Sequence, residues 1–466
     1  MKNQIFTIGA VIILTATNLV NTANAQTIAC GDYHSLSICS DNTVQSWGYN
    51  STGQLGNGTT INKNIPQQVV GLEGIIAVAG GQNYSLALKN DGTVWAFGGN
   101  AKGQLGDGST TNRLHPVKVQ GITDVISISA GFFHTLALKS DGTVWAWGWN
   151  YNGELGDGTT VDKHLPVQVS GLSGIIAIAG AGQHSLAIKN DGSIWVWGRN
   201  MDGELGDGTT VDKNIPEMLT SLTGITAITG GGIHSLALKN DGTVWAWGGN
   251  SSGQLGDGTT ISSLIPIMVN SLTGVVSIAA GGVSSIALKN DGTLLSWGYN
   301  PNGELGDGTT TNRNAPVPVN VVTGISSITT GADHSLAIKS DGSYWSWGLN
   351  AYGQLGDGTN SNRLSPVPIH TSCSITTGIK TTDENNAFSV VPNPTNGNFI
   401  CQFNGDKLSG NTNRIIIYNL VGEKVYESIT QGMNNETIDI TNQSVGIYFI
   451  TLRNDSKMYT EKFVKQ

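Results

Sequence analysis

Two runs of alternating apolar residues flank an Asp-Gly pair in the segment 126–169, and this pattern predicts a β-hairpin. The first run reads H-T-L-A-L-K and the second reads T-V-W-A-W-G. Alternation with a period of two is typical of strands, and Asp-Gly favours a two-residue turn in which both residues adopt positive φ. If Asp141 and Gly142 form that turn, Leu138 lies opposite Trp145, and opposed residues point to the same side of a sheet. We therefore expect one face of bulky Leu and Trp side chains and one face of small Ala, Thr and Val side chains.

Near copies of this pattern recur with a period of 50 residues and without insertion or deletion. The period is marked by one glycine in each of seven copies: Gly48, Gly98, Gly148, Gly198, Gly248, Gly298 and Gly348. A short strand-like run precedes each hairpin and another follows it, which gives four strands per copy. Seven such units, stacked bulky face on small face around an axis, predict an all-β, seven-bladed β-propeller over residues 26–370. An open solenoid is the alternative, but no polar capping repeats stand at the ends, which favours a closed ring.

The ends of the array leave two ways of closing the ring. The array begins with a first strand, Thr27–Cys30, and ends with a fourth strand, Pro366–Ile369. Either the seventh blade docks on the first, or its last strand joins the first blade as a clasp. Cys39 replaces the lysine of the other copies beside the hairpin turn, and Cys373 follows the last strand on the same face. In an oxidising compartment we expect a Cys39–Cys373 disulfide that latches the ring.

The repeated motifs resemble the regulator of chromosome condensation repeat family. The motifs are G-x-x-H-S/T-L-A-L/I, D-G-T/S-V/I-W-x-W-G and G-N-x-x-G-Q/E-L-G-D-G-T-T, and the resemblance covers residues 27–370. It implies a seven-bladed propeller. The founding member of that family is a nucleotide exchange factor for a small GTPase and binds chromatin through blade insertions and an arm, which this chain lacks. Secreted bacterial propellers of this type, such as one that inhibits β-lactamases, imply a binding role. Exchange-like activity on a small GTPase is kept as an alternative.

The first 25 residues read as a secretory signal peptide. Lys2 gives the positive start, Ile5–Val20 is apolar, and Ala23-Asn24-Ala25 is a small-residue cleavage site. The unbroken apolar core is short for a membrane span, so a membrane anchor is the less favoured reading. We expect signal-peptide cleavage and no integral membrane segment in the mature chain.

The last part of the chain has a different pattern. Residues 371–387 are polar and predict a linker, and residues 388–466 alternate between strand-like runs and Gly/Asn turns, which predicts a small β-sandwich. The P-N-P-x-x-G opening, the strand G-I-Y-F-I-T-L and the lysine-rich end resemble the C-terminal sorting domain of type IX secretion substrates in Bacteroidetes. The resemblance implies that the type IX machinery recognises residues 388–466 and delivers the protein across the outer membrane, either secreted or attached to the cell surface. A carbohydrate-binding accessory sandwich is the alternative.

Charge and composition narrow the classes of function. A net charge of −9 without a Lys/Arg stripe argues against a nucleic-acid partner. Each L-G-D-G-T-T loop holds one acid, which fits a turn closed by a side-chain oxygen better than a calcium site. We therefore expect neither a metal nor a cofactor. No Ser/His/Asp or Cys/His set stands out in the sequence as a candidate catalytic site. We therefore assign no catalytic residue and do not predict an enzyme. A hydrolase or lyase with its site in the central channel is the alternative.

Two residue types that suggest chemistry are better explained by packing. Five copies carry a histidine at one equivalent position, where we expect a hydrogen bond between blades rather than a metal ligand. They are His34, His134, His184, His234 and His334, with Tyr84 and Ser284 in the other two copies. Most of the twelve tryptophans, Trp195 among them, are expected in the core.

The positions at which the seven copies differ predict the binding face. Because successive strands of a repeat run in opposite directions, the loop between its first and second strands and the loop between its third and fourth strands lie on one face of the ring. The Asp-Gly turns lie on the opposite face. Exposed aromatic residues on a rigid set of loops suit protein or glycan recognition. The aromatic residues there are Tyr33, Tyr49, Phe132, Phe133, Trp149, Tyr151, Tyr299 and Tyr352. We predict that they bind a protein or polysaccharide partner of unknown identity; solvated loop variation without a ligand is the alternative.

Overall fold

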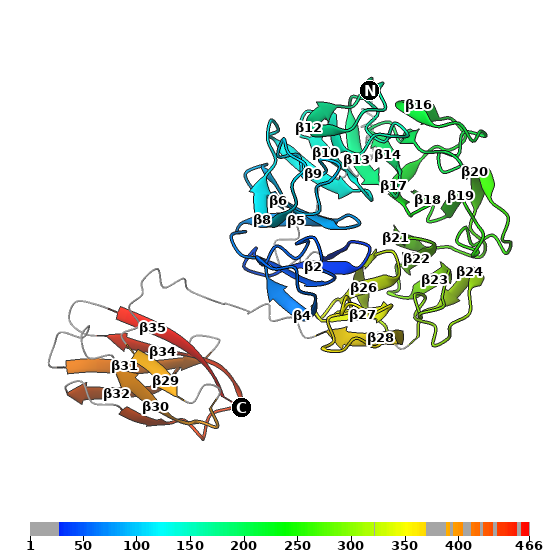
Figure 1. Ribbon diagram of the computed structural model, residues 1–466. Coiled ribbons are helices and arrows are strands. Elements are labelled where there is room, and N and C mark those ends of the chain that lie inside the picture. The colour runs from blue at the N-terminus through cyan, green and yellow to red at the C-terminus, as the bar shows by residue number, and fades with distance from the viewer. Residues whose placement is uncertain are drawn as a thin grey trace, which may run out of the picture. The chain divides into compact units, whose positions relative to one another are not determined.

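A computed structural model describes most of the chain, which forms two compact units, residues 1–375 and 376–466 (Figure 1). The described residues are 28–320, 322–369, 388–391, 395–403, 412–419, 423–431, 436–453 and 458–465. The predicted signal peptide and linker lie outside them. Each unit is considered by itself.

The larger unit is a ring of four-stranded antiparallel sheets (Figure 1), and each sheet consists of one 50-residue repeat with its strands in sequence order. Blade 1 contains β1 (Ile28–Cys30), β2 (His34–Ile38), β3 (Val44–Gly48) and β4 (Lys63–Gln68). Blade 2 contains β5 (Ile75–Gly80), β6 (Tyr84–Lys89), β7 (Val94–Gly98) and β8 (Arg113–Lys118). Blade 3 contains β9 (Val125–Ala130), β10 (His134–Lys139), β11 (Val144–Gly148) and β12 (Lys163–Gln168). Blade 4 contains β13 (Ile175–Gly180), β14 (His184–Lys189), β15 (Ile194–Gly198) and β16 (Lys213–Leu219).

The remaining blades repeat this arrangement. Blade 5 contains β17 (Ile225–Gly230), β18 (His234–Lys239), β19 (Val244–Gly248) and β20 (Ser263–Met268). Blade 6 contains β21 (Val275–Ala280), β22 (Ser284–Lys289), β23 (Leu294–Gly298) and β24 (Arg313–Pro318). Blade 7 contains β25 (Ile325–Thr330), β26 (His334–Lys339), β27 (Tyr344–Gly348) and β28 (Arg363–Ile369). The predicted seven-bladed propeller is confirmed.

The turn of the central hairpin differs from the prediction. In blade 3 the turn spans three residues, and only its last residue, Gly142, adopts positive φ (+78°). The N–H of Lys139 donates to the Thr143 carbonyl at 3.0 Å, and the N–H of Gly142 donates to the Lys139 carbonyl at 3.0 Å. This geometry is a type I turn followed by a glycine bulge. The Asp141 carboxylate stabilises it by accepting the Thr143 N–H at 2.9 Å, and the extra turn residue shifts the register by one.

The shifted register exchanges the side chains between the two faces. Thr135 lies opposite Trp147, and Ala137 lies opposite Trp145. One face of blade 3 therefore carries the tryptophans, and the other carries Leu136, Leu138, Val144 and Ala146. The predicted Leu-plus-Trp face is wrong, because the prediction assumed a two-residue turn.

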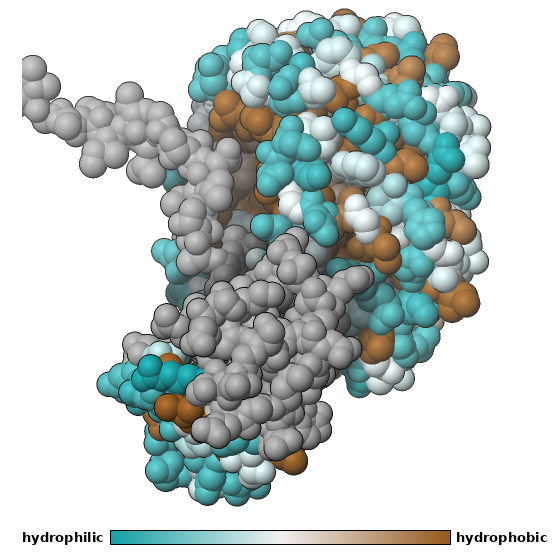
Figure 2. All heavy atoms as spheres, turned by 90° about the vertical axis from the view of Figure 1, so that its left-hand side faces the viewer, coloured by the Kyte–Doolittle hydropathy of each residue, from teal (hydrophilic) through white to brown (hydrophobic). Residues whose placement is uncertain are grey.

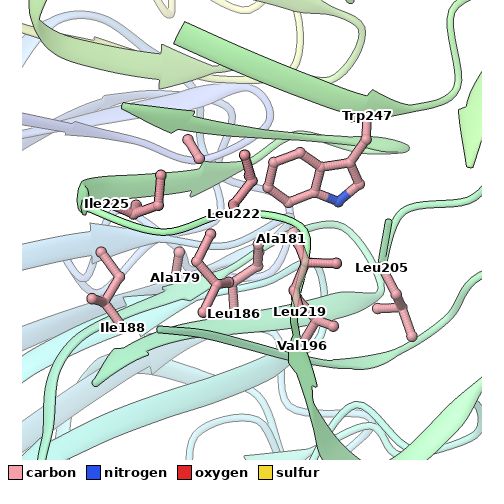
Figure 3. Packing of buried hydrophobic residues seen from close by; sticks show 12 residues of the cluster. Ala179, Ala181, Leu186, Ile188, Val196, Leu205, Leu219, Leu222, Ile225 and Trp247 are labelled. Atoms are coloured by element: carbon pink, nitrogen blue, oxygen red, sulfur yellow. The ribbon is translucent and has the colours of Figure 1, made fainter. Parts of the chain in front are cut away.

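Packing between blades uses these two unlike faces. The leucine face of blade 3 packs against Ala187 and Trp197 of blade 4. Figure 3 shows the next interface, where Leu186, Ile188 and Val196 of blade 4 lie below Trp247 of blade 5. Large and small side chains thus interdigitate between neighbouring sheets, as expected for a close-packed interior.

Polar contacts fasten each blade to the next. The Nε2 atom of each histidine at the repeated position lies 2.8–2.9 Å from a serine Oγ of the following blade, as predicted. The pairs are His34–Ser85, His134–Ser185, His184–Ser235, His234–Ser285 and His334–Ser35. Burial lowers the pKa of these imidazoles to about 3 or 4, so they are neutral at ordinary pH.

A second set of contacts comes from the inner tryptophans. Each donates its indole N–H at 2.7–3.0 Å to a backbone carbonyl of the preceding blade. The pairs are Trp47–Gln354, Trp147–Gln104, Trp197–Glu154, Trp247–Glu204, Trp297–Gln254 and Trp347–Glu304. These tryptophans are fully buried, whereas Trp195 is only half-buried.

The same contacts close the ring. The strand β28 pairs with β27 of its own blade, so the seventh blade docks directly on the first and the clasp alternative is excluded. Across this seam Ile28, Cys30 and Trp47 pack against Leu336 and its neighbours. The His334–Ser35 and Trp47–Gln354 hydrogen bonds cross it as well.

The cysteines are consistent with a latch but do not test it. Cys39 is buried and disulfide-bonded, whereas Cys30 and Cys401 are free. Cys373 lies outside the described residues, so its pairing with Cys39 stays a prediction.

The smaller unit is a sandwich of two sheets. One sheet contains β29 (Phe388–Val391), β30 (Asn398–Phe403) and β33 (Glu436–Asp439). The other contains β31 (Thr412–Asn419), β32 (Lys424–Gln431), β34 (Gly446–Arg453) and β35 (Met458–Lys465). Phe399, Ile417, Ile438, Ile450 and Phe463 are among the residues of the core between them. The predicted β-sandwich is confirmed.

Buried carboxylates occur at one propeller position where four other blades carry glutamine. The exposed fractions of Glu154 and Glu304 are 0% and 2%. Glu154 accepts the backbone N–H of Asn152 at 2.9 Å. Neither carboxylate forms an ion pair within the described part of the chain, whereas Glu204 in blade 4 pairs with Arg199. Burial raises the pKa of Glu154 to about 7 and also raises the pKa of Glu304.

We expect Trp197→Ala to destabilise the propeller by about 3–5 kcal/mol, because it removes a fully buried ring and its hydrogen bond. Trp195→Ala is the matched control, since Trp195 is half-buried and its loss should cost only roughly 1–2 kcal/mol. The free energy of unfolding in urea measures both. Equal losses for the two variants would contradict the assignment of the two tryptophans to different environments.

Glu154→Gln should stabilise the protein at pH 8 and change little at pH 5. The folded state holds the Glu154 proton up to about pH 7, above the ordinary value of 4.5, so the wild type loses stability as pH rises between these values. Glutamine keeps the hydrogen bond from the Asn152 backbone N–H, gives up the one that the Asn152 side-chain amide donates to the other carboxylate oxygen, and has no proton to lose. The gain at pH 8 is at most about 3 kcal/mol, read from urea unfolding at both pH values.

The reverse substitution in blade 5 is the control for this pH dependence. Gln254 is fully buried and accepts the Ser252 N–H at 2.9 Å, as Glu154 does in its blade. Gln254→Glu should therefore make the protein lose stability as pH rises from 5 to 8. If Glu154→Gln does not increase the free energy of unfolding at pH 8, ionisation of the buried Glu154 carboxylate does not destabilise the wild type.

Candidate functional site

The variable loops meet on one face of the propeller. In blade 1 the N–H of Tyr49, which begins the β3–β4 loop, donates to the carbonyl of Tyr33 in the β1–β2 turn at 2.9 Å. The same bond joins Trp149 to Phe133 in blade 3. We call the surface formed by the β1–β2-type turns and the β3–β4-type loops of all blades the loop face. The hairpin turns lie at the other ends of the strands.

A circle of backbone hydrogen bonds supports the loop face around the central channel. In each blade the N–H two residues before the repeated histidine position donates to a carbonyl of the next blade, at 2.9–3.3 Å. The donors are Asp32, Gln82, Phe132, Gly182, Gly232, Gly282 and Ala332. The last bond, from Ala332 to the Asp32 carbonyl, returns to blade 1. These bonds use only the backbone, so the side chains at these positions are free to differ.

The channel itself is narrow and lined mainly by glycine, alanine and threonine. It encloses a cavity of about 260 Å³. Glycine is required at its wall, because a Cβ on Gly31 would lie 2.1 Å from the His34 ring and 2.4 Å from the Gly81 carbonyl oxygen. Asp32 is the one carboxylate among the described lining residues. No acid–base pair converges among these residues, so the channel offers no support for the hydrolase alternative.

Three of the predicted aromatic residues come together at the seam between blades 7 and 1. The ring centroids of Tyr33 and Tyr352 are 5.6 Å apart, those of Tyr49 and Tyr352 4.7 Å, and those of Tyr33 and Tyr49 6.5 Å. All three rings are half-buried. We call this group the tyrosine cluster.

Two further predicted residues meet in blade 3. The rings of Phe133 and Trp149 pack edge to face at 5.4 Å. The ammonium group of Lys102, from blade 2, lies 5.6 Å from the centroid of a Trp149 ring and 3.6 Å from the Asp162 carboxylate. The aromatic surface of Trp149 is therefore already covered by a cation from the chain itself.

The other three predicted residues are not part of either cluster. Phe132 lines the channel, Tyr151 is 72% exposed, and Tyr299 is half-buried in blade 6. The eight aromatic residues thus share the loop face but do not form one continuous patch, and their role in binding stays a prediction.

Carboxylates beside the tyrosine cluster were missed in the sequence, although copy-to-copy comparison marks their positions as variable. Burial raises the pKa of Asp32 to about 7; a hydrogen bond with the Gln82 side chain lowers this value, and the nearby Asp333 carboxylate contributes to the rise. Burial also raises the pKa of Asp333, which accepts a hydrogen bond from the Tyr33 hydroxyl. Glu304 and Asp333 both raise the pKa of Tyr299, after burial. Three acids therefore act on the same part of the loop face.

The acids of the L-G-D-G-T-T loops are occupied by internal donors. Asp107 accepts the Ser109 N–H at 3.0 Å and pairs with Arg113 at 2.7 Å. In the first copy Asn57 accepts the Thr59 N–H at 3.1 Å in the same way. The turn-closing role predicted for this position is confirmed. Within the described ranges, no group of three His, Cys, Asp or Glu residues is placed to hold a metal ion.

The described part of the chain contains no helix long and apolar enough to cross a bilayer. On the side of the propeller visible in Figure 2, apolar residues lie interspersed among polar ones.

Comparison of individual repeats with known proteins finds short, strong similarities. The ultraviolet-B receptor UVR8 of Arabidopsis thaliana is 50% identical over 48 residues, which are 10% of this chain and 11% of that protein. The probable E3 ubiquitin-protein ligase HERC6 of Homo sapiens is 51% identical over 49 residues, 10% of this chain and 5% of that protein. The aligned segments thus span about a tenth or less of these relatives' length.

Solved structures match over most of the propeller. Human WBSCR16 has 26% sequence identity and a TM-score of 0.62, covering 68% of this chain and 86% of its own. Prp20p from Saccharomyces cerevisiae has 26% identity and a TM-score of 0.62, covering 71% of this chain and 86% of its own. Yeast RCC1 (Prp20) bound to Kap60 gives 25% identity and a TM-score of 0.63, with 75% and 85% covered.

Family comparison covers both units. Residues 8–186 and 166–388 match the RCC1-like domain, and residues 389–466 match the secretion system C-terminal sorting domain. Both resemblances stated from the sequence are confirmed, and the sorting domain supports an exported protein. The chain therefore belongs to the RCC1-like domain family and ends in a secretion system sorting domain.

Proposed function

We propose that this protein is an exported, non-enzymatic binding module whose loop face holds a protein partner outside the cell. The type IX secretion machinery would recognise residues 388–466 and bring the propeller to the outer cell surface or release it there. Removal of the signal peptide, residues 1–25, belongs to the same proposal.

The observation that carries this proposal is that the residues that hold the blades together are different from the variable residues of the loop face. Packing and polar contacts between blades occupy the residues that the seven copies share. Half-buried and exposed aromatic residues occupy the loops where the copies differ. Aromatic side chains on a rigid platform lose little conformational entropy on binding and are enriched at interaction hot spots.

A protein is favoured over a polysaccharide for two reasons. One structural neighbour, yeast Prp20 (RCC1), binds proteins: Gsp1p and histones, and Kap60, with which it has been solved in complex. In addition, Lys102 covers Trp149, which reduces the open aromatic surface on which a sugar ring would stack.

The test uses the mature full chain and a partner captured from the outer surface of the producing cells by a photo-crosslinker at Tyr151, the most exposed of the predicted residues. The triple variant Phe133→Ala, Trp149→Ala and Tyr151→Ala should bind the purified partner at least about tenfold more weakly. Its melting temperature should stay close to that of the wild type, because none of the three side chains is fully buried. Biolayer interferometry and calorimetry provide the two readouts.

A matched control removes exposed apolar side chains at the opposite ends of the strands. Ile126, Ile176 and Val276 are 49–55% exposed near the hairpin turns, and their joint replacement by alanine should leave partner binding unchanged. A glycan array tested with the same protein covers the polysaccharide outcome. The proposal is overturned if the loop-face variant binds like the wild type, or if the opposite-face variant is the one that loses the partner.

A further inference from the structure

We infer that the part of the loop face at the junction of blades 6, 7 and 1 is a subsite for a cationic side chain, arginine or lysine, supplied by the partner protein. This subsite consists of the tyrosine cluster and the carboxylates of Asp32, Asp333 and Glu304. The inference rests on the proposed function and specifies the chemistry of what that face binds.

The first argument is the lack of a countercharge. Asp32 is 8% exposed and Asp333 is half-buried, and the Asp333 carboxylate contributes, after burial, to raising the pKa of Asp32. Within the described ranges no Lys or Arg pairs with Asp32, Asp333 or Glu304. Several partly buried acids elsewhere are paired, Asp307 with Arg313 at 2.9 Å for example, whereas Glu154 in blade 3 is buried without an ion pair among the described residues. Carboxylates that share a site without a cation favour the arrival of one.

The second argument is the placement of the rings. The N–H of Ala332 donates to the Asp32 carbonyl at 3.3 Å, which brings Asp333 beside Tyr33, and the Asp333 carboxylate contributes, after burial, to the raised pKa of Tyr33. The Tyr33 ring packs against Tyr352, which packs against Tyr49. The carboxylate and the aromatic surface are thereby fixed next to each other. A cation beside the carboxylate also meets the negative face of a tyrosine ring, which adds a cation–π attraction.

The third argument is a comparison within the chain. Lys102 of blade 2 and Trp149 of blade 3 form a cation–π pair beside the Asp162 carboxylate. At the seam the equivalent positions hold Tyr352 and Tyr49, whose rings are in contact. The equivalent positions at the seam thus carry two aromatic rings and no cation, with Asn62 in place of Asp162. A cation from outside would complete this arrangement.

The fourth argument is that the fold does not require acids here. At the position of Asp32 the other copies have Gln, Phe, Gly, Gly, Gly and Ala, and at the position of Asp333 they have Tyr, Asn, Phe, Gln, Ile and Val. The circle of hydrogen bonds around the channel uses the backbone alone. Acids appear at these two positions only in blades 1 and 7, which are adjacent at the seam.

Arginine fits this subsite better than lysine. Its planar guanidinium group can lie flat on a tyrosine ring and donate two parallel hydrogen bonds to one carboxylate, whereas an ammonium group is a strongly hydrated point charge. We therefore expect both cations to bind and arginine to bind more tightly.

The test uses the mature full chain labelled with 3-fluorotyrosine and ¹⁹F NMR, with signals assigned by single Tyr→Phe variants. The probe is acetyl-Gly-Arg-Gly-amide, compared with the same peptide carrying Lys or Glu in the middle. The arginine peptide should shift the signals of Tyr33, Tyr49 and Tyr352 in a saturable manner, and the glutamate peptide should not. Asp333→Asn keeps an acceptor for the Tyr33 hydroxyl and should weaken arginine-peptide binding by about tenfold.

Two further variants keep this test decisive. Asp162→Asn removes the acid beside Lys102 at the other cluster and should leave binding of the arginine peptide unchanged. Tyr49→Leu introduces the residue that stands at the equivalent position in blade 7, so it should fold, and it should weaken binding by removing an aromatic ring. Equal shifts from the arginine and glutamate peptides, or unchanged binding by both Asp333→Asn and Tyr49→Leu, would overturn the subsite.

Failure of the subsite and failure of the proposed function give different results. If the arginine peptide does not bind but the triple variant at Phe133, Trp149 and Tyr151 still loses the captured partner, the loop face remains the binding face and the cationic subsite is wrong. If that variant and Asp333→Asn both keep the partner, the proposed function is wrong as well. Loss of the partner by Asp333→Asn, together with arginine-peptide binding, supports both.

Discussion

The contact between neighbouring blades is the constraint on which the propeller depends. Each contact combines a leucine face, a tryptophan face and two buried polar bonds, from a histidine to a serine and from an indole N–H to a backbone carbonyl. Because a buried polar group is costly unless it is paired, these bonds fix the register of one blade on the next as well as its distance. The same combination recurs at the seam, where His334 meets Ser35 and Trp47 meets Gln354. The ring can therefore close without exchanging a strand.

This constraint explains which parts of each repeat can change. A residue of the hairpin is held by packing on both faces, and the glycines of the channel wall are held by the lack of space for a Cβ. The β1–β2-type turns of the loop face are held by backbone hydrogen bonds, so the side chains at their variable positions are free to differ. The variable positions differ between blades. A lysine and a tryptophan pair at blades 2 and 3, while tyrosines and acids that pair with no Lys or Arg of the described residues lie where blades 7 and 1 meet.

The packed blades also tolerate buried carboxylates that destabilise the fold when they ionise. Glu154 and Glu304 place carboxylates where the other copies mostly have uncharged glutamine, and burial raises the pKa of both. A ring with many repeated contacts can carry such a cost, since the stability of the whole is shared among the blades. In blade 4 an arginine of the loop face, Arg199, pairs with Glu204 and offsets part of this cost, while burial still raises the pKa of Glu204 to about 7. The loop face and the buried layer beneath it are thus electrostatically connected.

The sequence by itself determined the number of blades, the four strands in each, the bridging role of the histidines and the face on which the variable loops lie. These follow from the strict period and from strand alternation, which are local properties. The hairpin register could not be read in the same way, because Asp-Gly is compatible with both a two-residue and a three-residue turn, and only the conformation of Asp141 distinguishes them. Only the tertiary structure decided that the seventh blade docks on the first, since strand count is complete in either case. It also decided that Tyr33, Tyr49 and Tyr352 meet beside Asp333, because residues separated by about three hundred positions become neighbours only when the ring closes.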